Sequence, residues 1–365
     1  MTTLTFESAP QRVCLLRLSA IGDTCHAVAA LRAMQAAWPQ TRFTWIIGKL
    51  EAKLMTAILP EIEFITFDKG AMLGEFKRLR ALLKGRRFDL LLHMQLSIRA
   101  SALSTLVRAP IKLGFDRRRA RELQWLFTNA RIAAARNEHV LDSFMRFPQA
   151  CGVATPEVPR FDVALPADAR AYADSVVSPA PGAPPRPTLL ISPCSSHVLR
   201  NWRAERYAAV ADHAAGAHGM HVVLVGGRSS LEKRIGEEIA AAARLPLLNQ
   251  IGKDTLPQLL GLMASSTALL TPDSGPAHMA TMVALPVLGL YAATRSARAG
   301  PYLSRGWCVD KYDAAARKYY GKPGTAVPWT LKIEKNGVMD LISVEEVNAK
   351  LDTLLAAIKA AKIPS

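Results

Sequence analysis

The sequence lacks the features that mark membrane, disulfide-bonded and dinucleotide-binding proteins. No apolar run reaches the roughly 18 residues of a membrane-spanning helix. The first apolar run, residues 13–18, contains Arg17, which argues against a signal peptide. The five cysteines are widely spaced with no CxxC pair, which excludes a zinc knuckle and a disulfide framework and suits a reducing cytoplasm. Neither GxGxxG nor a P-loop is present, so classical dinucleotide binding lacks its signature.

Acidic residues are scarce relative to basic ones. The 365 residues include 46 Lys and Arg against 30 Asp and Glu, which gives a net charge of +16. This surplus favours an anionic partner, such as a phospholipid surface or a phosphorylated substrate, over the alternative of a basic enzyme with a generic charge. No helix-turn-helix, RNA-recognition or zinc motif occurs, so nucleic acid is not an expected partner. A hydrophobic fraction of 50% excludes global disorder.

What the sequence does contain is an alternation of short apolar strands with amphipathic helices. Near-continuous apolar runs predict strands at residues 13–18, 43–48, 63–67, 89–94 and 111–114. Helical spacing predicts helices at residues 26–38, 72–84 and 98–107. This alternation is typical of a doubly wound parallel sheet covered by helices on both faces.

The alternation stops at a proline-rich segment and then restarts. Residues 175–187, SVVSPAPGAPPRP, disfavour both helix and central strand and predict a linker. Further strands are predicted at residues 188–192, 221–225, 267–271 and 287–291. We therefore expect an α/β fold of two Rossmann-like doubly wound domains facing a central cleft. The predicted parts are an N-terminal domain (1–174), the linker (175–187), a C-terminal domain (188–342) and a terminal helix (343–365) packing back on the first domain.

The first motif with chemical potential is LRLSAIGDTCHAVAAL, residues 15–30. A strand leads into a small loop, where Gly22 allows a tight turn, and a helix is expected to begin near Thr24. Asp23 stands at this junction. Two interpretations stay open at this point: the carboxylate caps the helix, or it lies at the rim of the cleft as a general base.

The second motif is LLISPCSSHVLRNW, residues 189–202, in which a strand runs into a polar loop. The hydroxyls of Ser195 and Ser196, the loop N–H groups and the Arg200 guanidinium suit a diphosphate. Taken alone, the segment is better explained as an exposed polar loop with a solvated arginine.

The third motif is ALLTPDSGPAHMATMVALPVLGLY, residues 268–291. Ser274 is a candidate helix cap, and Gly275 leaves room for a ligand beside the backbone at the positive end of the helix dipole. His278 is a candidate donor to a phosphate, with a packing role as the alternative. Asp273 would repel a phosphate, so we expect it to orient loop N–H groups or a sugar hydroxyl.

The fourth motif is VVLVGGRSSLEKRI, residues 222–235, which contains Glu232. A carboxylate at this place after a strand is able to accept both hydroxyls of a ribose. The alternative is a surface glutamate paired with a neighbouring Lys or Arg.

In this order and spacing, the four segments resemble the ADP-heptose:lipopolysaccharide heptosyltransferases of glycosyltransferase family 9, which are inverting enzymes of the GT-B fold. The most specific matches are RLSAIGDTCHAVAAL and TPDSGPAHMA, about 250 residues apart. The segment LGFDRRRARELQWLFTN, residues 113–129, is similar to the acceptor side of the heptosyltransferase I type. Residues 308–340 do not follow the family pattern, which leaves the subtype open.

The resemblance implies a role for each candidate residue. Asp23 matches the catalytic aspartate, and Arg200 stands where the family usually has a lysine, so it supplies charge but no proton. The implied donor-binding residues are Ser195, Ser196, Arg200, Glu232, Asp273, Ser274, Gly275 and His278. The implied acceptor-side residues are Gly22, Arg118 and Arg121.

The implied reaction moves heptose from ADP-heptose to the Kdo or heptose inner core on lipid A. Asp23 would act as the base, while Arg200, the two serines and the Gly275 helix would stabilise the leaving ADP. No metal or other cofactor is expected. Two clusters of basic residues in the N-terminal half are expected to dock the enzyme on the anionic cytoplasmic face of the inner membrane. They consist of Lys77, Arg78, Arg80, Lys84, Arg86 and Arg87, and of Arg117, Arg118, Arg119 and Arg121.

Other functions stay open from the sequence. The same scaffold would serve another acceptor or sugar, as in a protein or outer-core heptosyltransferase. A non-catalytic regulator that binds a nucleotide sugar is a further alternative, although the presence of Asp23 and the Gly275 loop together argues against a decayed site. A nicotinamide oxidoreductase is disfavoured because the glycine fingerprint is missing.

Overall fold

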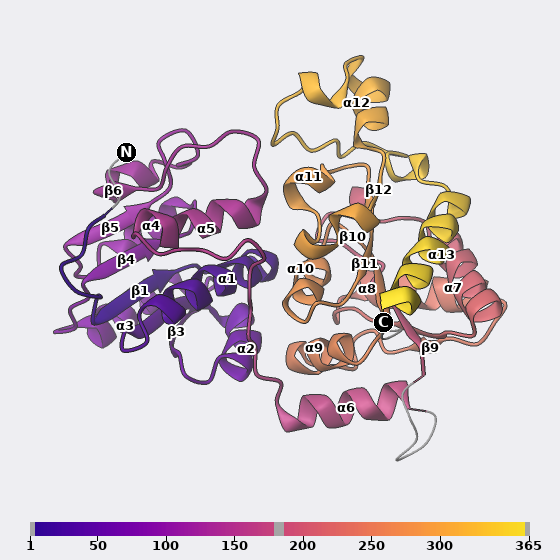
Figure 1. Ribbon diagram of the computed structural model, residues 1–365, viewed down its shortest axis with the longest axis horizontal. Helices are drawn as coiled ribbons and strands as arrows, with labels where there is room; N and C mark the ends of the chain where they lie inside the picture. The colour runs from indigo at the N-terminus through magenta and orange to yellow at the C-terminus, as the bar shows by residue number, and fades with distance from the viewer. Residues whose placement is uncertain (1–3, 179–185, 362–365) are drawn as a thin grey trace. The chain divides into compact units, whose positions relative to one another are not determined.

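The computed structural model describes residues 4–178 and 186–361, and the chain divides into two compact units, Met1–Ala164 and Leu165–Ser365. Each unit contains one six-stranded parallel sheet with helices on both faces (Figure 1). The predicted doubly wound α/β architecture is therefore confirmed. The boundaries of the predicted domains and the cleft stay predictions.

The first sheet has the strand order β3-β2-β1-β4-β5-β6. Its strands are β1 (Arg12–Leu16), β2 (Arg42–Gly48), β3 (Glu63–Phe67), β4 (Leu90–His93), β5 (Ile111–Gly114) and β6 (Ala130–Arg131). The helices of this unit are α1 (Ile21–Ala37), α2 (Lys49–Ile58), α3 (Met72–Leu83), α4 (Ile98–Ser104), η1 (Gln124–Leu126) and α5 (Val140–Ala150). Strand order reverses between β1 and β4, because the chain leaves β1 toward β2 and later returns to the other side of β1.

The apolar strands of the first sheet are buried on both faces, as a parallel sheet requires. Cys14 and Leu16 of β1 face a core that includes Leu79 of α3 and Leu103 of α4. Leu15 is also fully buried and alternates to the opposite face. Helix α1 packs against α5. Packing on both faces of β1 thus fixes the position at which the strand ends and the following loop begins.

The second sheet repeats this plan with the order β12-β11-β10-β7-β8-β9. Its strands are β7 (Thr188–Ile191), β8 (His221–Leu224), β9 (Leu248–Asn249), β10 (Ala268–Pro272), β11 (Val287–Tyr291) and β12 (Val309–Asp310). The α-helices are α6 (Ala167–Val177), α7 (Ala204–His218), α8 (Ser230–Ala242), α9 (Leu256–Ala264), α10 (Gly275–Met282), α11 (Ser296–Ala299), α12 (Tyr312–Tyr320) and α13 (Val344–Ala361). Four short 3₁₀ turns complete it, namely η2 (Val198–Arg200), η3 (Tyr302–Trp307), η4 (Gly324–Ala326) and η5 (Met339–Leu341).

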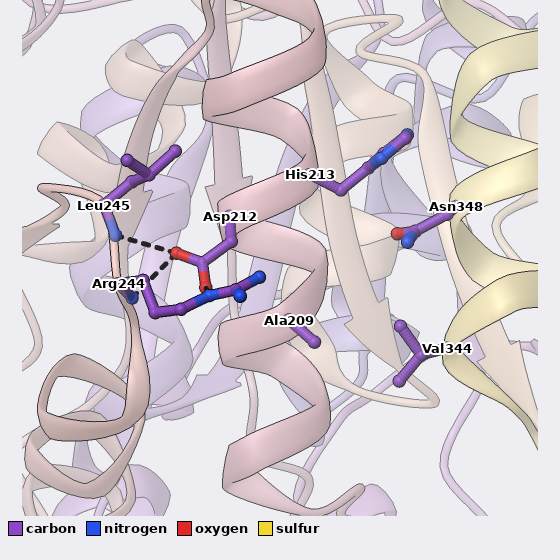
Figure 2. A pocket seen from close by; sticks show the side chains of 7 residues that line it. All are labelled: Ala209, Asp212, His213, Arg244, Leu245, Val344 and Asn348. Carbon is purple, nitrogen blue, oxygen red and sulfur yellow. Dashed lines mark hydrogen bonds and ion pairs between the residues drawn. The ribbon is translucent and has the colours of Figure 1, made fainter.

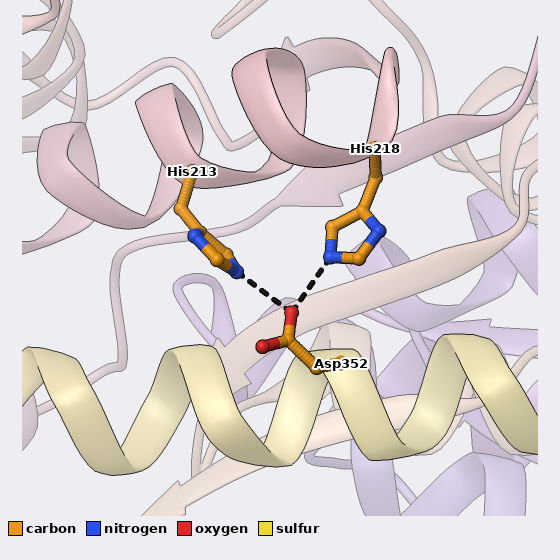
Figure 3. Close-up of side chains that lie close together, drawn as sticks. All are labelled: His213, His218 and Asp352. Carbon is orange, nitrogen blue, oxygen red and sulfur yellow. Dashed lines mark hydrogen bonds and ion pairs between the residues drawn. The ribbon is translucent and has the colours of Figure 1, made fainter.

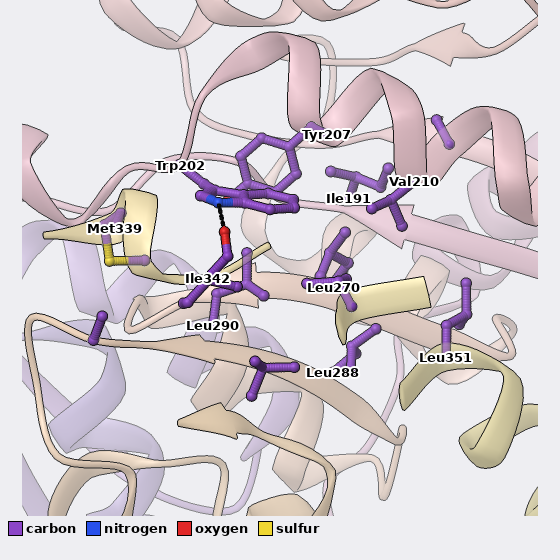
Figure 4. Packing of buried hydrophobic residues seen from close by; sticks show 14 of the residues in the cluster. Ile191, Trp202, Tyr207, Val210, Leu270, Leu288, Leu290, Met339, Ile342 and Leu351 are labelled. Carbon is purple, nitrogen blue, oxygen red and sulfur yellow. Dashed lines mark hydrogen bonds between the residues drawn. The ribbon is translucent and has the colours of Figure 1, made fainter. Parts of the chain in front are cut away.

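The core of the second unit joins the sheet to segments that are distant in the sequence. Trp202 stacks edge-on against Tyr207 and donates its indole N–H to the carbonyl of Ile342 at 3.1 Å (Figure 4). Leu351 of α13 is fully buried in the same core. The irregular segment before α13 is therefore held on the sheet by buried apolar contacts and by a hydrogen bond to its backbone.

Two elements bear on the predicted linker and on the terminal helix. Helix α6 ends at Val177, so the first residues of the segment predicted as a linker are helical, and α6 packs against α9 within the second unit. Residues 179–185 of that segment lie outside the described residues. Helix α13 packs against α7, and its apolar face belongs to the core of the second unit. Among the described residues, no helix combines the length and apolar character needed to cross a bilayer.

Candidate active site

Most candidate residues follow strands at the point where each sheet reverses its strand order. In the first unit Gly22 and Asp23 follow β1, and in the second the Ser195 loop follows β7 and the Asp273 loop follows its neighbour β10. Arg118 and Arg121 follow β5 instead, and Glu232 follows β8. Ligands of doubly wound sheets bind at the carboxyl ends of the strands at such a point. Each unit therefore has one candidate subsite of its own, and the two are described separately.

Asp23 is held by an arginine in the first unit. The guanidinium of Arg17 donates a short hydrogen bond to Oδ2 of Asp23. The side chain of Arg17 is only 8% exposed, whereas that of Asp23 is 35% exposed. No described residue donates a hydrogen bond to Oδ1 of Asp23. One carboxylate oxygen is thus held by Arg17, and the side chain as a whole is partly exposed to solvent.

The structure decides between the two interpretations of Asp23. Helix α1 begins at Ile21, three residues earlier than the sequence suggested, and its N-cap residue Ala20 makes no side-chain cap. Asp23 lies inside the first turn, and its carboxylate bonds Arg17 rather than a helix N–H group. The capping interpretation is therefore wrong. Gly22 is a buried residue of this first turn and not a turn glycine with positive φ, so that part of the expectation is also wrong.

Arg17 is itself fixed by the core of the first unit. It donates to the carbonyl of Met94 at 2.6 Å, and its guanidinium carbon lies 5.3 Å from the centre of the Phe144 ring. Burial lowers the pKa of Arg17, while the charge and hydrogen bond of Asp23 oppose this shift. The ordinary value of arginine is so high that the side chain stays cationic at neutral pH. Arg17 therefore presents a fixed positive charge to the carboxylate.

A pocket of about 360 Å³ lies beside this loop at the carboxyl end of the first sheet. Its lining residues are Leu18, Ser19, Lys69, Gln95, Ser97, Ile98, Arg99 and Glu122. The amide oxygen of Gln95 accepts hydrogen bonds from the N–H groups of Leu18 at 3.1 Å and Ser19 at 3.3 Å. These two hydrogen bonds join the loop after β1 to the loop after β4, at the point where the strand order reverses. No sequence motif surrounds Lys69, Gln95 or Arg99, so the sequence by itself gave no sign of their place in this pocket.

The arginines of the acceptor-side segment have different roles. Arg118 and Arg121 are exposed, as a substrate or surface contact requires. Arg117 lies over the Trp125 ring, 4.7 Å from its centre. Arg119 is instead bound by the carboxylates of Asp116 and Glu138 and donates to a backbone carbonyl at 2.6 Å. Arg119 is therefore a structural residue, and its predicted part in membrane docking is wrong.

In the second unit, Ser195 connects the two loops of the switch point. Its hydroxyl donates to the carbonyl of Asp273 at 2.7 Å, and its N–H donates to the side chain of Asn201 at 2.7 Å. The hydroxyl hydrogen of Ser195 is thus used within the protein. Ser196 is exposed at the same end of the sheet. Of the two hydroxyls, that of Ser196 is the better placed to contact a ligand.

Arg200 is enclosed by two carboxylates. It donates to Asp273 at 3.2 Å, and it donates twice to one oxygen of Glu334, at 2.6 and 2.9 Å. Its side chain is only 10% exposed. The interpretation as a solvated arginine is therefore wrong. Because two negative charges already surround this positive one, a diphosphate would compete with a carboxylate for the guanidinium.

Glu334 and Lys332 belong to this subsite, although the sequence analysis missed both. Burial by itself would raise the pKa of Glu334, but the hydrogen bond and charge of Arg200 outweigh it and lower the pKa. Burial lowers the pKa of Lys332, and the charge of Arg200 lowers it further. Both residues lie in the segment 308–340, which carries no recognisable motif. Only the folding of this segment against the β7 loop brings them to Arg200.

The third motif forms the start of a helix at the end of β10. Ser274 is the N-cap residue of α10, but its hydroxyl lies 2.8 Å from that of Thr271 and makes no cap hydrogen bond. The expected side-chain cap is therefore wrong. The helix begins at Gly275, with a proline in its first turn and no acidic residue there, and His278 is buried in it. The positive end of the helix dipole is thus presented to the subsite.

Glu232 lies in the first turn of α8 and makes local hydrogen bonds. Its carboxylate accepts from the N–H of Gly227 at 2.7 Å and from the hydroxyl of Ser229 at 2.5 Å. Its neighbourhood includes Cys194 of the β7 loop, whose pKa is raised to about 12 by burial and by the charge of Glu232. Pairing with a neighbouring Lys or Arg, the alternative for Glu232, is not what the structure shows. The carboxylate is preorganised beside the subsite.

Comparison with known proteins agrees with this arrangement. Residues 76–325 match the model of glycosyltransferase family 9 (heptosyltransferase). The chain is 40% identical over 349 residues to the lipopolysaccharide core heptosyltransferase OpsX of Haemophilus influenzae, covering 96% of this chain and 98% of that protein.

Solved structures show the same fold at lower identity. The glycosyl transferase family 9 protein of Veillonella parvula superposes with a TM-score of 0.78 at 21% identity, covering 95% of this chain and 98% of the other. The ADP-heptose lipopolysaccharide heptosyltransferase II of E. coli superposes with a TM-score of 0.71 at 19% identity, covering 95% and 99%. The predicted GT-B-like fold and the family resemblance are both confirmed.

Proposed function

Because the chain belongs to glycosyltransferase family 9, the heptosyltransferase family, we propose that it moves heptose from ADP-heptose to the Kdo or heptose inner core of lipopolysaccharide, with inversion. That it is a glycosyltransferase follows from the family itself. The H. influenzae relative is a lipopolysaccharide core heptosyltransferase, which supports this acceptor class over a protein acceptor.

The observation that carries the proposal is the Asp23 carboxylate held by Arg17. In an inverting transfer, the acceptor oxygen attacks the anomeric carbon as the bond to the diphosphate breaks, and a base takes the hydroxyl proton. Asp23 is that base, with Oδ1 receiving the proton while Arg17 holds Oδ2. Arg17 is a positioning residue, because it acts through the carboxylate.

The second unit stabilises the leaving diphosphate. The N–H groups at the start of α10 and the exposed Ser196 supply donors, and Lys332 and Arg200 supply positive charge. Glu334 would exchange its place on Arg200 with a phosphate oxygen when the donor binds. Glu232 accepts the ribose hydroxyls. The proposal includes no metal or other cofactor, because Arg200, Lys332 and the α10 N–H groups supply the donors for the diphosphate.

We propose further that the enzyme works at the anionic cytoplasmic face of the inner membrane. The docking segment, residues 117–126, combines the exposed Arg117, Arg118 and Arg121 with Leu123 and Leu126, which are 52% and 59% exposed. Exposed basic side chains beside apolar ones are typical of surfaces that bind anionic bilayers. In the basic cluster at residues 77–87, Arg78 pairs with Glu75, and Arg86 pairs with Glu63. The positive charge that this cluster offers to a membrane therefore comes from Lys77, Arg80, Lys84 and Arg87.

Product analysis tests the proposal directly. The full chain would be incubated with ADP-heptose and with either Kdo-lipid A or a core that already carries heptose, and mass spectrometry and NMR would identify the new linkage. A heptose with inverted anomeric configuration on one of these acceptors is expected. Transfer only to a protein or to an outer-core sugar would overturn the proposed acceptor, and retention of configuration would overturn the role of Asp23.

A further inference from the structure

Two histidines and an aspartate converge on one point of the second unit. Nε2 of His213 lies 2.7 Å from Oδ1 of Asp352, and Nε2 of His218 lies 2.6 Å from the same oxygen (Figure 3). The histidines belong to α7 and the aspartate to α13. In the part of the chain that the structure describes, this is the one group of three such side chains whose ligand atoms lie within 4.8 Å of one another.

This cluster is separate from the transferase subsite. His218 is the last residue of α7, next to the start of β8, whereas α7 begins near the loop that follows β7. A helix of 15 residues is roughly 22 Å long, so the cluster lies at the opposite end of α7 from Arg200. Its role is therefore independent of the chemistry proposed above.

The arrangement of the three side chains also matches that of ligands around a metal ion. Both imidazoles point their Nε2 atoms at one carboxylate oxygen, and their ring centres are only 5.4 Å apart. Two imidazolium ions at this distance would repel each other. Imidazole nitrogens and carboxylate oxygens are common metal ligands, and here one atom of each side chain lies within 4.8 Å of the other two.

A pocket of about 450 Å³ lies beside His213 of the cluster. His213 and Asn348 both line it (Figure 2). Asn348 lies one turn before Asp352 on α13, and its buried Oδ1 has no hydrogen-bond partner. Asp212, which also lines the pocket, is already used, because it accepts from the N–H groups of Arg244 at 2.9 Å and Leu245 at 2.8 Å. Of these two residues, Asn348 rather than Asp212 is thus the candidate for a fourth oxygen ligand.

We propose that His213, His218 and Asp352 bind a divalent transition-metal ion, with Zn²⁺ the best match, that fastens α13 to α7. Two imidazole nitrogens and a carboxylate oxygen are typical zinc ligands, and hard cations such as Mg²⁺ prefer all-oxygen sites. Around a tetrahedral zinc ion the ligand atoms would lie about 3.3 Å apart, so the present contacts need to open by only roughly 0.6 Å. The fourth position goes to Asn348 or to water.

The test is metal binding and thermal stability of the full chain, with no use of enzymatic activity. Titration calorimetry on metal-stripped protein should show one Zn²⁺ bound per chain and no comparable binding of Mg²⁺. A hundredfold excess over the Kd should raise the Tm of the second unit by roughly 5–10 °C. His213→Gln, His218→Gln and Asp352→Asn should each weaken Zn²⁺ binding more than about tenfold.

Glu345→Gln provides the matched control, because it removes one exposed carboxylate from the same helix without touching the cluster. This variant should keep both the affinity and the rise in Tm. The ligand variants should still fold, since α13 is held mainly by buried residues such as Val347, Leu351 and Leu354. Failure of the wild-type chain to bind Zn²⁺ would overturn the proposal. Equal binding by Asp352→Asn and by the wild type would also overturn it.

Discussion

Arg200 and Glu334 are 134 residues apart in the sequence, yet their side chains meet at 2.6 Å. Glu334 has a lowered pKa because the hydrogen bond and charge of Arg200 outweigh its burial. The cation that the family pattern assigns to the donor diphosphate is thus already paired in the free protein. If Arg200 holds the diphosphate as proposed, donor binding displaces a carboxylate, and we expect the affinity for ADP to report this competition.

Glu334→Gln should therefore strengthen ADP binding. The amide keeps the shape of the side chain but removes the negative charge that competes with the diphosphate. We expect the Kd for ADP to fall by about fivefold to tenfold, which corresponds to roughly 1 kcal/mol. Titration calorimetry measures it. Asp340→Asn is the matched control, since Asp340 lies in the same segment as Glu334 but pairs with Arg203. This variant should leave the Kd for ADP unchanged. Weaker binding by Glu334→Gln would show that Glu334 supports the diphosphate instead of competing with it.

Asp23→Asn should remove the base and leave donor binding intact. Loss of general-base catalysis typically costs about 10²–10⁴ in rate, so kcat should fall within this range. The Kd for ADP should change by less than about twofold, because Asp23 lies in the first unit and the donor residues in the second. Asp168→Asn, at an exposed carboxylate, serves as the control. Turnover within tenfold of the wild type would remove Asp23 from the mechanism.

Arg17→Met should lower kcat with little change in the KM for ADP-heptose. Without the guanidinium, the Asp23 carboxylate loses its fixed orientation, and we expect a loss of about tenfold to hundredfold. Arg17→Lys should recover part of the lost kcat. The ammonium group restores the positive charge but lacks the planar guanidinium that bonds both Asp23 and the Met94 carbonyl. If Arg17 acts through Asp23, the double variant with Asp23→Asn should be no slower than Asp23→Asn alone. Additive losses would mean that Arg17 contacts the substrate itself.

Reversal of charge in the docking segment should weaken membrane binding. Arg118→Glu combined with Arg121→Glu is expected to reduce binding to vesicles of anionic phospholipid by more than about tenfold, at roughly 1 kcal/mol per basic residue near the surface. The wild-type binding should fall as salt rises. Arg234→Glu, exposed on α8 of the second unit, is the control and should bind as the wild type does. Unchanged sedimentation of the double variant with vesicles would exclude this segment.

Arg119→Ala should instead lower stability, because Arg119 neutralises the buried Asp116 and the Glu138 carboxylate. Removing one member of such a cluster costs about 3 kcal/mol. Denaturant unfolding measures this loss, and the docking-segment variants should not show it.

Asp254 should make the stability of the second unit depend on pH. Burial raises its pKa to about 6 from the ordinary 3.8, and its Oδ2 has no hydrogen-bond partner. The folded state therefore holds the proton more tightly than the unfolded state. The resulting stabilisation is fully present below pH 3.8 and is lost as the pH rises through about 6.

Asp254→Asn should abolish this dependence and be about 2 kcal/mol more stable than the wild type at pH 8. Urea unfolding at pH 5 and pH 8 measures the difference. The control is Asp340→Asn, whose carboxylate has a lowered pKa, so it should not gain stability at pH 8. A variant that follows the wild type at both pH values would contradict the assignment.

The local pattern was sufficient for the longer strands, for helices such as α1, α3 and α4, and for two loops. It did not predict the short strands β6, β9 and β12 or the helices α2 and α5. The apolar runs that became β1, β7 and β10 are buried on both faces, and a parallel sheet leaves such runs little choice of environment. The polar residues directly after those strands were predicted for the same reason, since the carboxyl ends of neighbouring strands meet at one edge. Capping was predicted less well, because Asp23 and Ser274 had equally good partners in space.

The sequence by itself determined the two doubly wound sheets, the family and the residues that follow the strands. Only the tertiary structure decided which charges meet: Asp23 with Arg17, Arg200 with Glu334, and His213 with Asp352. The physical reason is range. Apolar periodicity determines secondary structure over a few consecutive residues, so it can be recognised in the sequence. An ion pair depends on distances of a few ångströms between segments that only folding brings together.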